Sequence, residues 1–61
     1  MPELSEQIVR AVQEHGRATV LGLVELTGAN RATVRNHLRR LVLDNVLAQH
    51  GKGRGVWYTL P

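Results

Sequence analysis

The sequence predicts an α+β fold, in which three helices precede a small antiparallel β-hairpin in the order α-β-α-α-β-β. Two observations carry this prediction. Apolar residues recur at helical spacing along the N-terminal part of the chain, with capping residues and glycines between the segments. The C-terminal part has two short apolar runs on either side of GKGRG (51–55), a pattern typical of a hairpin. With 61 residues, the chain is expected to form one domain over 1–61.

The first helix is expected in LSEQIVRAVQEHG, residues 4–16. Ser5 is a suitable N-cap, because its hydroxyl can accept a hydrogen bond from a free backbone N–H of the first turn. Gly16 would end the helix. The face expected to be buried, set by the helical period, comprises Ile8, Ala11, Val12 and His15.

The second helix is expected in LGLVELTG, residues 21–28, after a short extended segment at 17–20. Thr19 is a suitable N-cap, and Gly28 would end the helix.

The third helix is expected in RATVRNHLRRLVLD, residues 31–44. Asn30 can cap its N-terminus. Asn45 can end it, because asparagine tolerates the left-handed conformation better than any residue except glycine. The core face of this helix comprises Val34, Leu38 and Leu41.

The two strands of the hairpin are expected in VLAQH (46–50) and VWYTL (56–60). Side chains alternate between the two faces of a strand, so Tyr58 shares a face with Val56 and Leu60. Tyr58 is therefore expected to pack in the core, and Trp57 to point outward. The three glycines of the connecting loop permit unusual φ angles and a close approach to another backbone.

Two stretches, LVELTGANRATVRNHLRRL (23–41) and GKGRGVWYTL (51–60), carry a resemblance to the winged helix-turn-helix family of DNA-binding domains. The first is similar to a helix-turn-helix, with Gly28 in the turn and apolar residues at the family's spacing after it. The second is similar to a wing, a basic hairpin loop that ends in an apolar strand. The chain departs from the family pattern at Val24, where a small residue is usual, and at Asn45, where glycine is usual. The resemblance covers nearly the whole chain and implies a winged helix-turn-helix fold and a transcriptional regulator that binds double-stranded DNA in a sequence-specific manner.

The third helix carries the residues expected to contact DNA. An α-helix fits the major groove, and in helix-turn-helix docking the N-terminal part of the recognition helix reads base edges. Arginine suits guanine, asparagine suits adenine and a threonine methyl group can touch thymine, so base contacts are expected from Arg35, Asn36 and Thr33. The further DNA-binding residues expected on this helix are Asn30 and the phosphate-binding Arg31, Arg39 and Arg40. The alternative is that RNHLRR is only a solvated basic face.

The glycine-rich loop carries two further candidates, Lys52 and Arg54. Both can bind phosphates or reach into the minor groove, whose negative potential attracts arginine. The alternative is a flexible hairpin whose cations keep its tip in water. A nucleotide-binding phosphate loop is not expected, because GKGRG opens a strand and not a helix.

The other polar residues predict no enzyme, no metal site and no cofactor. His15, His37 and His50 fall on three different elements, and the chain has no cysteine. Ser5 is the only serine and the five acidic residues are scattered, so no pair of nucleophile and base can be proposed. No small-molecule ligand or membrane span is expected, and the predicted location is the cytoplasm, in association with the nucleoid.

A net charge of +3 favours an anionic partner, for which double-stranded DNA is the first candidate. Two other functions stay open: a winged helix that serves as a protein–protein or assembly module, and one that binds RNA. A single small module covers only about 600–1,000 Å² of DNA-facing surface, so a homodimer on DNA is also expected. The apolar residues expected at its contacts are Leu21, Leu43 and Trp57.

Overall fold

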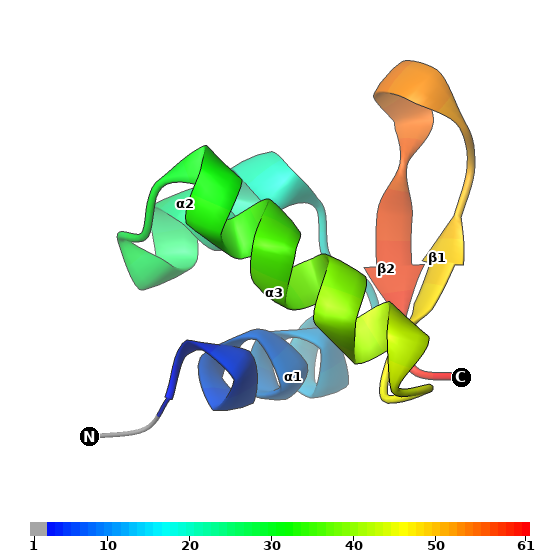
Figure 1. Ribbon diagram of the computed structural model, residues 1–61, viewed down its shortest axis with the longest axis horizontal. Helices are drawn as coiled ribbons and strands as arrows, with labels where there is room; N and C mark the ends of the chain where they lie inside the picture. The colour runs from blue at the N-terminus through cyan, green and yellow to red at the C-terminus, as the bar shows by residue number, and fades with distance from the viewer. Residues whose placement is uncertain (1–2) are drawn as a thin grey trace.

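The computed structural model describes residues 3–61, except for the side chain of Arg54. Three helices pack against one another, and a two-stranded antiparallel hairpin stands beside them (Figure 1). The elements are α1 (Leu4–His15), α2 (Val20–Thr27), α3 (Arg31–Leu43), β1 (Ala48–His50), the short 3₁₀ helix η1 (Gly53–Gly55) and β2 (Trp57–Thr59). We refer to residues 48–59 as the wing. The predicted α+β fold is confirmed, although the expected first strand is reduced to a single bridge between Ala18 and Tyr58.

Helix α1 begins before the residue that was expected to cap it. Glu3 occupies the N-cap position without a side-chain cap hydrogen bond, and Ser5 lies inside the first turn. The Ser5 hydroxyl instead forms a 2.8 Å hydrogen bond with Nδ1 of His37 on α3. The predicted Ser5 cap is therefore wrong, because this hydroxyl finds a tertiary partner. His15 is also exposed, although the helical period placed it on the buried face.

The caps of α2 and α3 follow the sequence. Thr19 Oγ1 accepts a 3.1 Å hydrogen bond from the backbone N–H of Gly22, and Asn30 Oδ1 accepts one of 2.8 Å from that of Thr33. Helix α3 ends at Leu43, and Asn45 follows with φ of 59°. Asn45 thus adopts the predicted left-handed conformation, which lets the chain turn from α3 towards the wing.

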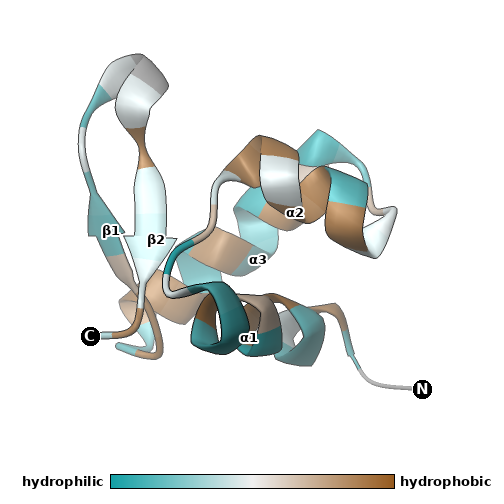
Figure 2. Cartoon of the chain, turned by 180° about the vertical axis from the view of Figure 1, so that it is seen from behind, coloured by the Kyte–Doolittle hydropathy of each residue, from teal (hydrophilic) through white to brown (hydrophobic). Residues whose placement is uncertain are grey.

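The core lies where the three helices meet the inner face of the wing. Its buried residues are Ile8, Ala11, Val12, Leu23, Val34, Leu38, Leu41, Leu47 and Tyr58. Every apolar residue predicted for the buried faces of α1 and α3 is among them. Figure 2 shows the polar outward side of α1 and the largely hydrophobic α2. Two leucines of α2, Leu21 and Leu26, remain exposed.

The wing is held to the helices through Tyr58. In the hairpin, Gln49 lies opposite Tyr58, and His50 lies opposite Trp57. On its other side Tyr58 exchanges two backbone hydrogen bonds with Ala18, of 2.8 and 2.9 Å. Tyr58 is packed in the core, as predicted, whereas Trp57 is half-buried and stacks on His50 with ring centroids 5.7 Å apart. This double pairing fixes the position of the wing beside α3.

Candidate nucleic-acid interface

Helix α3 exposes four arginines and carries no acidic residue between Arg31 and Leu43. Asn30 caps the helix, and Val34, Leu38 and Leu41 are its buried residues. Within the part of the chain that the structure describes, none of the four guanidinium groups forms an ion pair or a hydrogen bond. The exposed arginines are Arg31, Arg35, Arg39 and Arg40. They are therefore available to an external anion.

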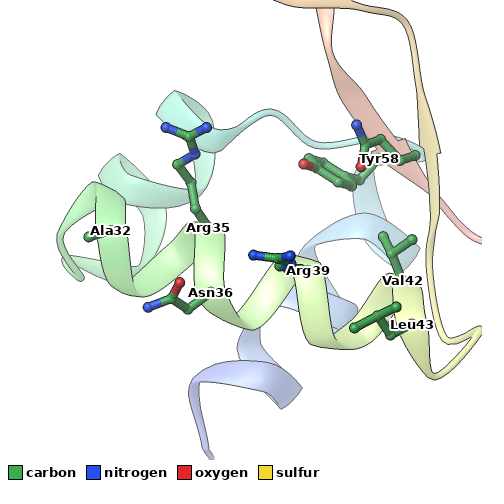
Figure 3. A pocket seen from close by; sticks show the side chains of 8 residues that line it. Ala32, Arg35, Asn36, Arg39, Val42, Leu43 and Tyr58 are labelled. Carbon is green, nitrogen blue, oxygen red and sulfur yellow. The ribbon is translucent and has the colours of Figure 1, made fainter.

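Two open hollows lie between α3 and the wing. The first has a volume of about 620 Å³ and is lined by Ala32, Arg35, Asn36, Arg39, Val42, Leu43, Gln49 and Tyr58 (Figure 3). The second has a volume of about 570 Å³ and is lined by Thr19, Val20, Leu21, Arg31, Arg35, Gln49, Gly53, Val56 and Tyr58. Arg35, Gln49 and Tyr58 line both hollows, which therefore adjoin. We refer to the residues that line the two hollows as the α3–wing face.

Several of the predicted DNA-binding residues come together on this face. Arg35 lies at its centre, and Asn36 and Arg39 line the first hollow. Arg31 lines the second hollow, beside the N-terminus of α2. The helical period alone places Asn36 and Arg39 on the far side of α3 and Arg35 on its flank, and the position of the wing is what brings them into one concave surface.

Other predicted residues lie outside the two hollows. The side-chain oxygen of Asn30 is engaged in the cap of α3, and Thr33 is half-buried beside it. Arg40 lines a separate hollow with Ser5 and His37, towards the N-terminus of α1. The contacts expected of these residues with DNA stay predictions.

The two cationic residues predicted to bind DNA from the wing are Lys52 and Arg54. Lys52 is exposed next to the tip, and its backbone carbonyl accepts a hydrogen bond from the backbone N–H of Gly55. The side chain of Arg54 lies outside the described part of the chain. Of the two cationic side chains predicted at the wing tip, the structure therefore describes that of Lys52.

Sequence reasoning missed Gln49 and the outward-reaching end of Tyr58. Gln49 is exposed on β1 and lines both hollows, as does Tyr58 on β2. Figure 3 shows the Tyr58 hydroxyl directed towards the space between Arg35 and Arg39. The hairpin register could have suggested the pairing of Gln49 with Tyr58, but not their position opposite α3.

The three apolar residues expected at a dimer contact do not share one patch. Leu43, 74% exposed, lines the first hollow, and Leu21, 60% exposed, lines the second. Trp57 lies on the other face of β2 from Tyr58 and stacks on His50. Leu21 and Leu43 thus lie on the α3–wing face and Trp57 lies outside it, and the homodimer stays a prediction.

The three histidines lie on different elements and have different surroundings. His50 Nε2 lies 2.8 Å from Thr59 Oγ1, His37 contacts Ser5, and His15 is exposed. No group of three or more histidine, cysteine or acidic residues that could hold a metal occurs among the described residues. In the same part of the chain, none of the helices has the length and hydrophobicity required to span a bilayer.

Two comparisons with known proteins find similar chains. Residues 1–48 match the model of a protein family described as winged helix-turn-helix DNA-binding. The structure is similar over its whole length to that of BpsR from Bordetella bronchiseptica, with a TM-score of 0.87 and 26% sequence identity. That structure is described as explaining the regulation of BpsR DNA binding by 6-hydroxynicotinic acid, and the present chain covers 44% of it. A comparison with curated proteins finds no match.

Proposed function

The chain belongs to the winged helix-turn-helix DNA-binding family, and on that premise we propose that it binds double-stranded DNA through the α3–wing face as part of a transcriptional regulator. The observation that carries the proposal is the set of four exposed arginines on α3, which have no partner among the described residues and stand beside a wing whose tip is also basic. Similarity to BpsR, whose DNA binding is regulated, supports the regulatory role.

In the proposed complex, α3 enters the major groove and the wing lies over the neighbouring backbone or minor groove. Arg35 and Asn36 line the first hollow from the middle of α3, which suits them to base edges. Arg31 is the first residue of the helix and Arg39 lies one turn beyond Arg35, and both suit phosphates at the groove edges. Lys52 adds a phosphate contact from the wing.

The first test is the salt dependence of binding to duplex DNA. If roughly four cations neutralise phosphates, the logarithm of the association constant falls with the logarithm of the salt concentration at a slope of about −3.6 per protomer. Fluorescence anisotropy with a labelled random-sequence duplex at several salt concentrations measures this slope. A slope near zero would contradict the proposal, and tighter binding to a single-stranded RNA of equal length would favour the RNA-binding alternative.

A second prediction separates base recognition from phosphate binding. Arg35→Ala is expected to cost about 1–3 kcal/mol on a selected specific duplex and less on random DNA, because a bidentate guanine contact is lost only at the specific site. Lys52→Ala is expected to weaken both complexes by the same factor, since phosphates are present in every sequence.

The two variants are a matched pair, because each removes one exposed cation from the proposed interface. The specific duplex is obtained by selection from a random library, and both affinities are measured at one salt concentration. Equal losses on specific and random DNA for Arg35→Ala would assign this residue to the backbone and remove it from sequence recognition.

A further inference from the structure

Tyr58 combines a buried ring with a hydroxyl group that has no hydrogen-bond partner in the described chain. The residue is 9% exposed, and its backbone is paired with Gln49 on one side and Ala18 on the other. Its hydroxyl forms no hydrogen bond with the rest of the described chain. No buried side-chain polar atom in the described chain lacks a partner, so this unpartnered hydroxyl must reach solvent. Both hollows that it lines are on the α3–wing face.

The surroundings of this hydroxyl are suited to an anion. Arg35 lines the same two hollows from α3, and Arg39 lines the first. Gln49, opposite Tyr58 in the hairpin, is exposed and adds an amide group without a protein partner in the described chain. The floor between α3 and the wing thus offers a phenolic O–H and an amide N–H₂ as donors, flanked by two guanidinium groups.

The expected path of DNA places a phosphate group at this floor. With α3 in the major groove and the wing beyond its edge, the strand that bounds the groove has to cross between them. We propose that the Tyr58 hydroxyl and the Gln49 amide donate hydrogen bonds to one phosphodiester group of this strand. This inference rests on the proposed DNA-binding function and specifies how the backbone is held in the α3–wing face.

A contact of this kind has a distinctive signature. Both donors are uncharged, so they add affinity without releasing a counterion and leave the slope of the salt dependence unchanged. The contact also carries no direct sequence information, because it is made to the backbone. Tyr58 is held by packing and by backbone pairing on both sides, so little side-chain freedom is lost when DNA binds.

The variant Tyr58→Phe tests the proposal, because it keeps the buried ring and removes only the hydroxyl. We expect the dissociation constant to rise about tenfold, which is the lower end of the contribution of a hydrogen bond to a charged group, on specific and random duplexes alike. The salt slope is expected to equal that of the unmodified protein, whereas Arg39→Ala is expected to reduce it by about one. Thermal unfolding followed by circular dichroism checks that Tyr58→Phe retains the fold.

Duplexes with a single neutral methylphosphonate identify the phosphate involved. At one position of the scan, the methylphosphonate is expected to weaken binding of the unmodified protein. The Tyr58→Phe variant is expected to bind this modified duplex with the same affinity as the unmodified protein does. At all other positions, Tyr58→Phe is expected to keep its full tenfold loss. Gln49→Ala is expected to lose its effect on affinity at the same methylphosphonate position as Tyr58→Phe, which would place both donors on one phosphate.

The outcomes separate this inference from the proposed function. If the unmodified protein binds duplex DNA but Tyr58→Phe binds equally well, the phosphate contact is wrong and the DNA-binding function stands. A loss confined to the specific duplex would overturn the contact in favour of base recognition by Tyr58. A Tyr58→Phe loss that is equal at every methylphosphonate position would also overturn it. Failure of the unmodified protein to bind any duplex would overturn both proposals.

Discussion

Replacing Leu38 with alanine is expected to lower the free energy of unfolding by about 2–5 kcal/mol. Leu38 is completely buried in the middle of α3, where it faces the core. A domain of 61 residues has a total stability of only about 3–9 kcal/mol at typical values per residue. The substitution is therefore expected to leave a large fraction of the protein unfolded at physiological temperature, and to reduce DNA binding through loss of the folded helix.

Urea unfolding followed by circular dichroism measures this effect, and Leu43→Ala is the matched control on the same helix. Leu43 is 74% exposed, so its truncation is expected to change stability by no more than about 0.5 kcal/mol. Similar losses for the two variants would contradict the packing of α3 described above.

The helix ends could be predicted from the sequence where the capping partners are close along the chain. Thr19 and Asn30 each bond a backbone N–H three residues later, so both interactions are visible in a short window of sequence. Ser5 has the same chemistry, but its partner His37 is 32 residues away. A local pattern favours a cap at Ser5, and only the packing of α1 on α3 decides otherwise.

For the candidate site too, the features that depend on nearby residues were predictable from the sequence, and those that depend on tertiary packing were not. Helical periodicity was enough to put Asn36 and Arg39 on the side of α3 away from the core, and Arg35 on a flank between the two sides. The contribution of the wing depends on its position relative to α3, which the Ala18–Tyr58 bridge fixes. Strand alternation indicated that Tyr58 points inward. It could not indicate that the far end of this long side chain emerges between α3 and the wing.

The wing is expected to be most sensitive to substitution at Gly51. This residue has φ of 80°, and a Cβ added there would collide with the backbone carbonyl oxygen of Gly55 and come within 2.9 Å of Trp57 Cζ3. The left-handed conformation alone costs an L-residue about 1–2 kcal/mol, and relief of the collision requires the hairpin to open. Gly51→Ala is therefore expected to disorder the wing tip and to weaken DNA binding by about tenfold or more, because phosphate contacts from this side are lost.

Two other glycines of the same loop separate the causes of this effect. Gly53 has φ of 62° but nothing within 4 Å of an added Cβ, so Gly53→Ala is expected to show only the conformational cost of about 1–2 kcal/mol. Gly55 has neither a left-handed φ nor a close neighbour, and Gly55→Ala is expected to be nearly neutral. Trp57 is the only tryptophan, so its fluorescence reports on the wing in all three variants, and anisotropy gives their DNA affinity. The order of loss is expected to be Gly51, then Gly53, then Gly55. If Gly51→Ala proved no more damaging than Gly53→Ala, the close contact of Gly51 with Gly55 would not contribute to the structure of the wing or to DNA affinity. The glycines would then make the wing tip flexible, and the tip would not depend on close packing.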